Sequence, residues 1–190
     1  MRKAYIASGP RGSGKTTFIK KLQSQNKSLI VFERDEFLNR NFGERWTDPY
    51  YFPWFLIAHV IEEEIKNISN SNSGDINLIV DCWNGNFDER NKLVKILRDL
   101  EFDVVNCIYF CVPREICLRW FRNKSDSVFY SDDSVIGDWN TYHRLADDLR
   151  NPDEHATFDL DTCESTCLFD NIFTVNPAQM VIPGMRFNLQ

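Results

Sequence analysis

Residues 9–16 read Gly-Pro-Arg-Gly-Ser-Gly-Lys-Thr, and this stretch decides the fold of the chain. It matches the pattern GxxxxGK[ST] at every fixed position, follows a short apolar run at residues 3–8 and precedes a helical pattern at residues 15–23. Glycines in such a loop let consecutive backbone N–H groups point inward around phosphate oxygens, and the following helix adds its positive end. The sequence therefore predicts a P-loop that cradles a nucleotide.

The side chains of this loop predict a site for ATP and Mg²⁺. Lys15 can reach the outer phosphates as a point charge, and the Thr16 hydroxyl can join the Mg²⁺ shell. The residues expected to bind the nucleotide are Gly9, Gly12, Ser13, Gly14, Lys15, Thr16 and Thr17. The loop by itself does not select a reaction, because many GTPases, motors and ATPases carry it too.

The order of the remaining segments predicts an α/β fold. Apolar runs at 28–33, 76–80, 103–111 and 170–175 read as further strands, and the helical patterns between them favour a parallel sheet covered by helices. Residues 69–75 read as a polar surface loop, too short for a domain boundary. With 190 residues, we expect a single domain over 1–190.

Two aspartates stand where strands end. Asp35 follows the second predicted strand and Asp81 ends the third. Ligands of open α/β sheets bind beyond the carboxyl ends of the strands, so both should lie near the phosphate cradle. Asp35 could accept the proton of an attacking hydroxyl or merely cap the next helix. Asp81 could hold Mg²⁺, orient Lys15 or a substrate group, or be an ordinary turn residue.

The segment after the fourth predicted strand carries arginines on one helix face. Arg119 and Arg122 are three residues apart, and guanidinium groups are suited to the charge that grows during phosphoryl transfer. The helix should begin at Pro113 and lead into a polar segment. We therefore expect a lid over about residues 113–137. The alternative is a solvated basic face.

The order of these features resembles a known family. The segments SGPRGSGKTT, ERDEF, LIVDCWNGNFDERNKL, VPREICLRWFRNK and RNPDEHATFD are similar to those of small P-loop kinases related to the phage 5′-polynucleotide kinase domain and to zeta-toxin-type kinases. The resemblance covers about residues 1–176. It implies a P-loop NTPase fold with a five-stranded parallel sheet, helices on both faces and an arginine-bearing lid after strand four.

The resemblance also implies roles for particular residues. Lys15 and Thr16 would bind Mg·ATP, Asp35 would activate the acceptor hydroxyl, and Arg119 or Arg122 would touch the transferring phosphate. Asn176, after the fifth strand, would lie where such kinases contact adenine. In the polynucleotide kinase pattern an arginine that grips the substrate phosphate stands three positions after the aspartate; here that position is Leu38, with Arg40 two residues later.

An acceptor pocket is expected from the aromatic segment at 42–55 and from residues 83–87 after the third strand, with Arg40 and Arg45 beside the aromatic residues. Aromatic rings beside arginines could stack a base or a sugar and hold a phosphate, although aromatic residues more often serve packing. The residues expected on the substrate side are Arg34, Arg40, Arg45, Asp81 and Trp83.

Composition narrows the partners and the compartment. A formal net charge of −6 argues against broad non-specific binding to duplex nucleic acid. Six cysteines without a signal peptide or a membrane-length apolar run favour a reduced, cytoplasmic protein with packed thiols. Pairs such as Cys107 and Cys111 are four residues apart, so a zinc site is a minor alternative.

The sequence thus favours an ATP-dependent kinase with a hydroxyl acceptor, similar to polynucleotide 5′-hydroxyl kinases. A small-molecule kinase acting on a nucleoside, a sugar or a nucleotide sugar is one alternative. A non-kinase nucleotide-binding switch or ATPase is the other; the GTPase form is weakened because NKSD at 123–126 follows a helix rather than a strand.

Overall fold

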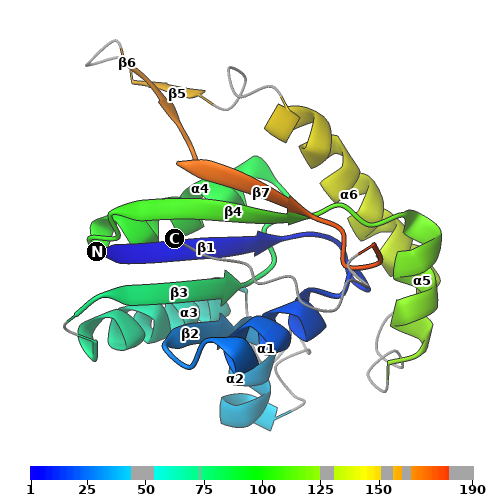
Figure 1. Cartoon of the computed structure of the whole chain (residues 1–190), viewed down its shortest axis with the longest axis horizontal. Helices are drawn as coiled ribbons and strands as arrows, with labels where there is room; N and C mark the ends of the chain where they lie inside the picture. The colour runs from blue at the N-terminus through cyan, green and yellow to red at the C-terminus, as the bar shows by residue number, and fades with distance from the viewer. Residues whose placement is uncertain (44–53, 73, 125–130, 151–155, 160–163, 180–190) are drawn as a thin grey trace.

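The computed structural model describes residues 1–43, 54–72, 74–124, 131–150, 156–159 and 164–179 (Figure 1). Side chains are described for these ranges except at 54–57, 144–150, 156–159 and 164–167.

The centre of the molecule is a five-stranded, all-parallel sheet in the order β2-β3-β1-β4-β7. Its strands are β1 (Arg2–Ser8), β2 (Leu29–Glu33), β3 (Ile76–Asp81), β4 (Val104–Phe110) and β7 (Asn171–Val175). The sheet that the P-loop and the alternation of segments predict is confirmed. The strand carrying the P-loop lies in the middle, so the loop emerges at the centre of the carboxyl edge.

The residues of β1 alternate between two apolar layers. Ala4 and Ile6 face a large core shared with α2, α3 and α4, whereas Tyr5 and Ala7 face a smaller one built around α1. Because successive side chains of a strand point to opposite faces, a strand buried on both faces reads as a continuous apolar run. Helices cover both faces, as expected.

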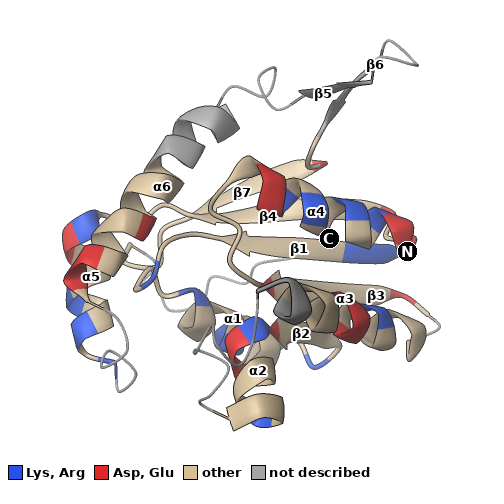
Figure 2. Ribbon diagram, turned by 180° about the vertical axis from the view of Figure 1, so that it is seen from behind, with Lys and Arg blue, Asp and Glu red and all other residues tan. Residues whose placement is uncertain are grey.

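The helices connect the strands in the predicted places. Their bounds are α1 (Lys15–Gln25), α2 (Arg34–Phe42), α3 (Trp54–Asn70), α4 (Phe87–Asp99), α5 (Arg114–Arg122) and α6 (Asp132–Arg150). Asn86 caps α4 by accepting a hydrogen bond from the Glu89 N–H. Helix α4 lies behind the sheet in Figure 1 and in front of it in Figure 2, where charged residues gather on the helices and the central strands are mostly uncharged.

Helices α5 and α6 pack together beyond the carboxyl ends of the strands (Figure 1). Helix α6 begins at Asp132, inside the range of about 113–137 that was expected to form the lid. Asp132 and Asp133 lie in the first turn of this helix, where their negative charges interact favourably with its positive end. The Ser131 hydroxyl accepts a hydrogen bond from the Ser134 N–H. The expected polar lid segment therefore narrows to about residues 123–131, of which 125–130 lie outside the described residues.

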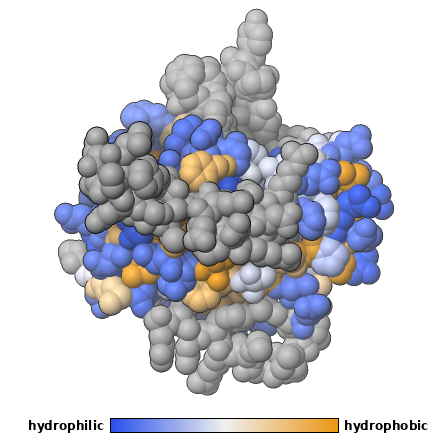
Figure 3. All heavy atoms as spheres, turned by 90° about the horizontal axis from the view of Figure 1, so that it is seen from above, coloured by the Kyte–Doolittle hydropathy of each residue, from blue (hydrophilic) through white to orange (hydrophobic). Residues whose placement is uncertain are grey.

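A short antiparallel pair was not predicted. It consists of β5 (Ala156–Asp159) and β6 (Glu164–Cys167), which form a two-stranded sheet separate from the main one. In the view of Figure 3 the described surface is mostly hydrophilic with scattered apolar residues. None of the described helices has the length and apolar character that a membrane span requires.

Candidate active site

The P-loop turns back on itself between β1 and α1. Gly12 and Gly14 have positive φ angles of 72° and 82°, which residues with a Cβ rarely adopt. The Ser13 hydroxyl is buried in this turn and has no hydrogen-bond partner among the described residues. The loop thus has the backbone form and the unsatisfied polar atom that a bound phosphate group fits.

Lys15 lies along the floor of the same loop. Its Nζ donates to the Gly9 carbonyl at 2.7 Å and to the Pro10 carbonyl at 3.1 Å. Burial lowers the pKa of Lys15, while the nearby carboxylates of Asp81 and Asp138 oppose this shift. A partly buried ammonium with carbonyl partners is held ready for an anion at the mouth of the loop.

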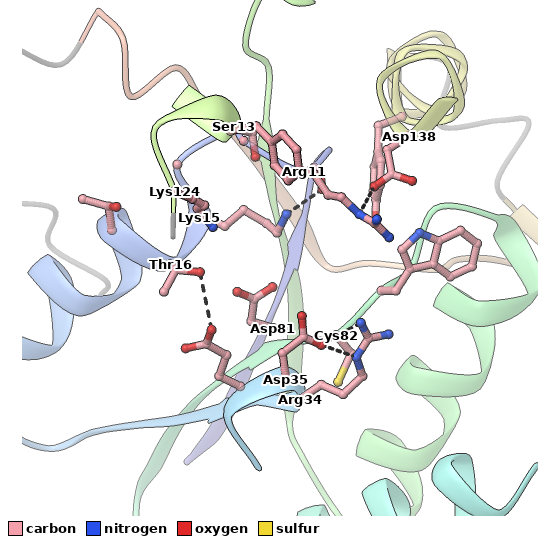
Figure 4. A pocket seen from close by; sticks show the side chains of 18 residues that line it. Arg11, Ser13, Lys15, Thr16, Arg34, Asp35, Asp81, Cys82, Lys124 and Asp138 are labelled. Atoms are coloured by element: carbon pink, nitrogen blue, oxygen red, sulfur yellow. Dashed lines mark hydrogen bonds and ion pairs between the residues drawn. The ribbon is translucent and has the colours of Figure 1, made fainter. Parts of the chain in front are cut away.

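The strand register brings the two predicted aspartates to this loop. Strands β2 and β3 are neighbours with Glu33 opposite Asp81, so Asp35 at the start of α2 and Asp81 reach the same edge. A cavity of about 130 Å³ joins the P-loop to both aspartates (Figure 4). Lys15, Thr16, Asp35 and Asp81 all line it, together with Trp83.

The oxygen atoms beside Thr16 suit a divalent cation. The Thr16 hydroxyl lies 3.5 Å from Oε1 of Glu33, and Asp81 lines the same cavity. Burial raises the pKa of Asp81 and that of Glu33. The Asp35 carboxylate raises the pKa of Asp81 further, and the Asp81 carboxylate raises that of Glu33. Carboxylate and hydroxyl oxygens are ligands that Mg²⁺ prefers, and a cation would relieve the crowding of negative charge. Thr16 and Asp81 therefore fit the expected metal site, with Glu33 beside them.

The Asp35 carboxylate is oriented by its neighbour. Nε and Nη2 of Arg34 donate to Oδ1 of Asp35 at 2.8 Å and 2.7 Å. The Arg34 side chain is 14% exposed and that of Asp35 is 51% exposed, so a mostly buried guanidinium holds a carboxylate that faces the cavity.

The opposite wall carries an ion pair between the P-loop and α6. Arg11 Nε lies 2.9 Å from Oδ2 of Asp138, and both residues line the cavity (Figure 4). Burial raises the pKa of Asp138, although Arg11 and Lys15 work against this rise. A carboxylate thus faces the place where phosphates would bind.

Replacing Asp138 with Asn is expected to strengthen ATP binding about fivefold. Removing a negative charge from the wall of a phosphate site removes a repulsion of roughly 1 kcal/mol and leaves the Arg11 cation facing the cavity. Calorimetric titration of both proteins with Mg·ATP measures the effect. Asp133→Asn, on the exposed side of the same helix, is the control, and equal or weaker binding by Asp138→Asn would contradict the expectation.

Helix α5 rests directly on the P-loop. A Cβ on Gly12 would overlap the Cys117 carbonyl and crowd Phe121, and a Cβ on Gly14 would come within 3.1 Å of the Trp120 ring. Cys117 and Phe121 are buried in the cluster that joins α5 to α6.

Gly12→Ala is therefore expected to lower the free energy of unfolding by about 1–3 kcal/mol, because it combines a positive φ with a backbone overlap. Chemical denaturation measures this change. The matched control is Gly137→Ala in α6, where no atom lies within 4 Å of the added methyl group. Equal stability of the two variants would show that α5 does not press on the loop as described.

Several predicted residues lie elsewhere. Arg119 and Arg122 are exposed and are not among the residues that line the cavity; Arg122 is paired with Asp132, its Nε 3.1 Å from Oδ1. Arg40 lines a second cavity between α1 and α2, with Lys20 and Glu36 among its walls. Arg45 lies outside the described residues.

Asn176 stands apart from the P-loop cavity. Its side chain accepts from the Ala178 N–H at 3.1 Å and lines a separate, mainly apolar cavity with Pro10, Val112 and Trp139. Thr17, in contrast, lines the main cavity beside Thr16. The P-loop, Arg34, Asp35, Asp81 and Trp83 are thus brought together, whereas Arg40, Arg119, Arg122 and Asn176 are not.

The cavity also contains residues that the sequence analysis did not select. They are Arg11, Glu33, Cys82, Phe121, Lys124, Asp138 and Tyr142. Asp138 and Tyr142 are four residues apart on α6, and their spacing is a signal of one helix face. Their placement at the site needed the position of α6, which the sequence did not provide.

A family model described as an AAA domain matches residues 5–145. The chain belongs to this family. The matched region contains the whole P-loop, both aspartates and the start of α6. Membership agrees with the resemblance to P-loop kinases seen in the sequence and with a nucleotide-binding role for this loop.

Solved structures share the fold at low identity. The Pnkp1/Rnl/Hen1 RNA repair complex contains a chain that is 19% identical with a TM-score of 0.65, over 77% of this chain and 46% of that one. A chain of the PezAT toxin–antitoxin system of Streptococcus pneumoniae is 15% identical with a TM-score of 0.55, over 92% of this chain and 68% of that one.

A curated relative matches in part. Biotin synthase of Thermotoga petrophila is 33% identical over 99 residues, which cover 45% of this chain and 32% of that protein. The chain thus spans about a third of this relative and less than half of the Pnkp1-complex chain.

Proposed function

We propose that this protein transfers the γ-phosphate of ATP to a hydroxyl group of an acceptor. The observation that carries the proposal is the single cavity that joins the P-loop to the Asp35 carboxylate. A nucleotide-binding switch needs the phosphate cradle, but it has no need of an oriented carboxylate across a cavity from it. A kinase needs both, because an acceptor hydroxyl must lose its proton while it attacks the phosphate.

Asp35 would act as the general base. Within the described residues both contacts from Arg34 reach Oδ1 of Asp35, which leaves Oδ2 to accept the proton of the acceptor hydroxyl. The acceptor oxygen then forms a bond to the γ-phosphorus, the bond to the bridging oxygen breaks, and ADP leaves. Arg34 holds the base in place and directed into the cavity.

Lys15 and the loop amides would hold the phosphates in line for this attack. Thr16 and Asp81 would hold Mg²⁺, with Glu33 close by. The bound ion would neutralise charge on the phosphate oxygens.

The 5′-hydroxyl of a polynucleotide is the first acceptor to test. The sequence resembles the phage polynucleotide kinase domain, and the fold is shared with a chain from an RNA repair complex. Trp83 lines the acceptor end of the cavity, where an indole could stack on a base.

A small hydroxyl-bearing molecule is the second candidate, and the surroundings of Leu38 favour it. Leu38 takes the position of the phosphate-gripping arginine and is 0% exposed, packed in the core. Arg40 lines the other cavity. Neither of these positions can thus offer a cation to a phosphate of a polynucleotide at the reacting end.

Incubation with γ-labelled ATP and an acceptor panel tests the proposal. The panel consists of 5′-hydroxyl oligonucleotides, nucleosides, nucleotide sugars and sugars, with Asp35→Asn as the matched control. Label on one class that is lost in the control supports the proposal and selects the acceptor. ATP binding without transfer to any acceptor would contradict the kinase assignment, and a strong preference for GTP would favour a switch instead.

A further inference from the structure

The turn that ends α5 carries a lysine into the active-site cavity. Lys124 lines the cavity together with Lys15, Thr16 and Asp81, and it reaches down from the end of α5 toward Lys15 in Figure 4. Its backbone N–H donates to the Phe121 carbonyl at 2.9 Å, which fixes the turn to the last part of the helix. Lys124 is therefore held by described structure, one residue before the range that the structure leaves out.

The packing of α5 places the turn that carries this lysine beside the P-loop. Cys117 and Phe121 press against Gly12 of the P-loop and are 0% and 5% exposed. Cys117 and Phe121 are four residues apart and share one face of α5, whereas Lys124 lies in the turn after the helix. Lys124 thus follows the part of α5 that contacts the loop, and it lines the same cavity as Phe121.

The same geometry turns the two arginines away. Arg119 is two residues from both Cys117 and Phe121, a spacing of about 200° around the helix, so it points to the far side. Arg122 follows on that side and is bound to Asp132 at the start of α6, with its Nε 3.1 Å from Oδ1. That ion pair joins α5 to α6 at an exposed surface.

The charges around the cavity are consistent with an anion between two lysines. Burial is the main cause of the lowered pKa of Lys15, and the positive charge of Lys124 lowers it further. The lining also includes carboxylates such as Asp81 and Asp138, which offset part of this positive charge. A terminal phosphate placed between Lys15 and Lys124 would contact both ammonium groups.

We infer that Lys124, in the turn after α5, rather than Arg119 or Arg122 on that helix, contacts the terminal phosphate of ATP and stabilises its charge during transfer. The inference rests on the proposed function for the transfer step, but its binding step requires ATP alone. An ammonium group is a compact point charge and is well suited to a phosphate oxygen. It would contact ATP and have no partner in ADP.

Comparison of ATP and ADP affinities in the presence of Mg²⁺ tests the contact without any acceptor. Lys124→Ala should bind ATP about tenfold more weakly while its ADP affinity stays within twofold of wild type. Lys95→Ala, which removes an exposed lysine of α4, is the matched control. In single-turnover transfer, Lys124→Ala should be slower by about 10²-fold.

The arginine variants test the alternative that Arg119 or Arg122 contacts the terminal phosphate. The inference is overturned if Lys124→Ala keeps the wild-type difference between ATP and ADP, or if Arg119→Ala or Arg122→Ala loses that difference instead. The binding result decides the inference even if no acceptor in the panel is phosphorylated, so its failure can be told apart from failure of the kinase proposal. Equal wild-type affinities for ATP and ADP would also count against it.

Discussion

Asp35→Asn is expected to slow phosphoryl transfer by about 10²-fold or more while ATP binds as it does in the wild type. An amide has nearly the shape of the carboxylate, but it cannot accept the proton of the acceptor hydroxyl. The nucleotide should be unaffected because the phosphate cradle is built from other residues of the cavity. Single-turnover transfer and calorimetric titration with Mg·ATP measure the two quantities.

The matched control for this substitution is Glu36→Gln. Glu36 is an exposed carboxylate on the same turn of α2, and it lines the second cavity rather than the one with the P-loop. This variant should transfer phosphate at the wild-type rate. If Asp35→Asn were equally active, Asp35 would have no part in the proton transfer.

Lys15→Ala is expected to impair both ATP binding and transfer, with transfer reduced by about 10²–10³-fold. The ammonium group is the partly buried cation of the P-loop, and its loss leaves the outer phosphates without their strongest partner in the loop. Lys21→Ala, on the exposed side of α1, is the control for loss of a lysine.

A second measurement separates this effect from a damaged loop. Lys15 donates to the carbonyls of Gly9 and Pro10, so its removal also withdraws two hydrogen bonds from the turn. Thermal unfolding should show a cooperative transition in Lys15→Ala. A folded variant that still binds ATP as tightly as the wild type would contradict the role of Lys15.

The fold was predictable because its signals are local and agree with one another. The run at β1 leads into the P-loop, and each later strand is an apolar run separated from the next by a helical pattern. Strand order is not local, and no stretch of the sequence by itself places β1 between β3 and β4. The β5–β6 pair was missed, because two strands of four residues leave little pattern to read.

The site was predictable where position along a strand decides it. Asp35 and Asp81 follow neighbouring parallel strands, and the carboxyl ends of such strands meet at one edge. The lid arginines were selected by residue type and mutual spacing, which say that two residues share a face but not which way that face points. The direction is set by Gly12, whose missing side chain admits Cys117 and Phe121 of α5, and no pattern within α5 reveals that contact.

On α2, too, the sequence did not reveal which way the side chains of Leu38 and Arg40 point. This helix buries Phe37 and Leu38 in the core, so the position that the family resemblance assigns to substrate binding serves packing in this chain. Arg40 follows two residues later and therefore leaves the helix on another side, toward the cavity between α1 and α2.

A crystal structure with Mg²⁺ and a non-hydrolysable ATP analogue tests the central claim most directly. We expect the backbone amides of residues 9–16 to surround the phosphates, with the terminal group pointing across the cavity at the Asp35 carboxylate. A terminal group that points away from Asp35, or is separated from it by closed protein, would contradict the transferase assignment even with the nucleotide bound.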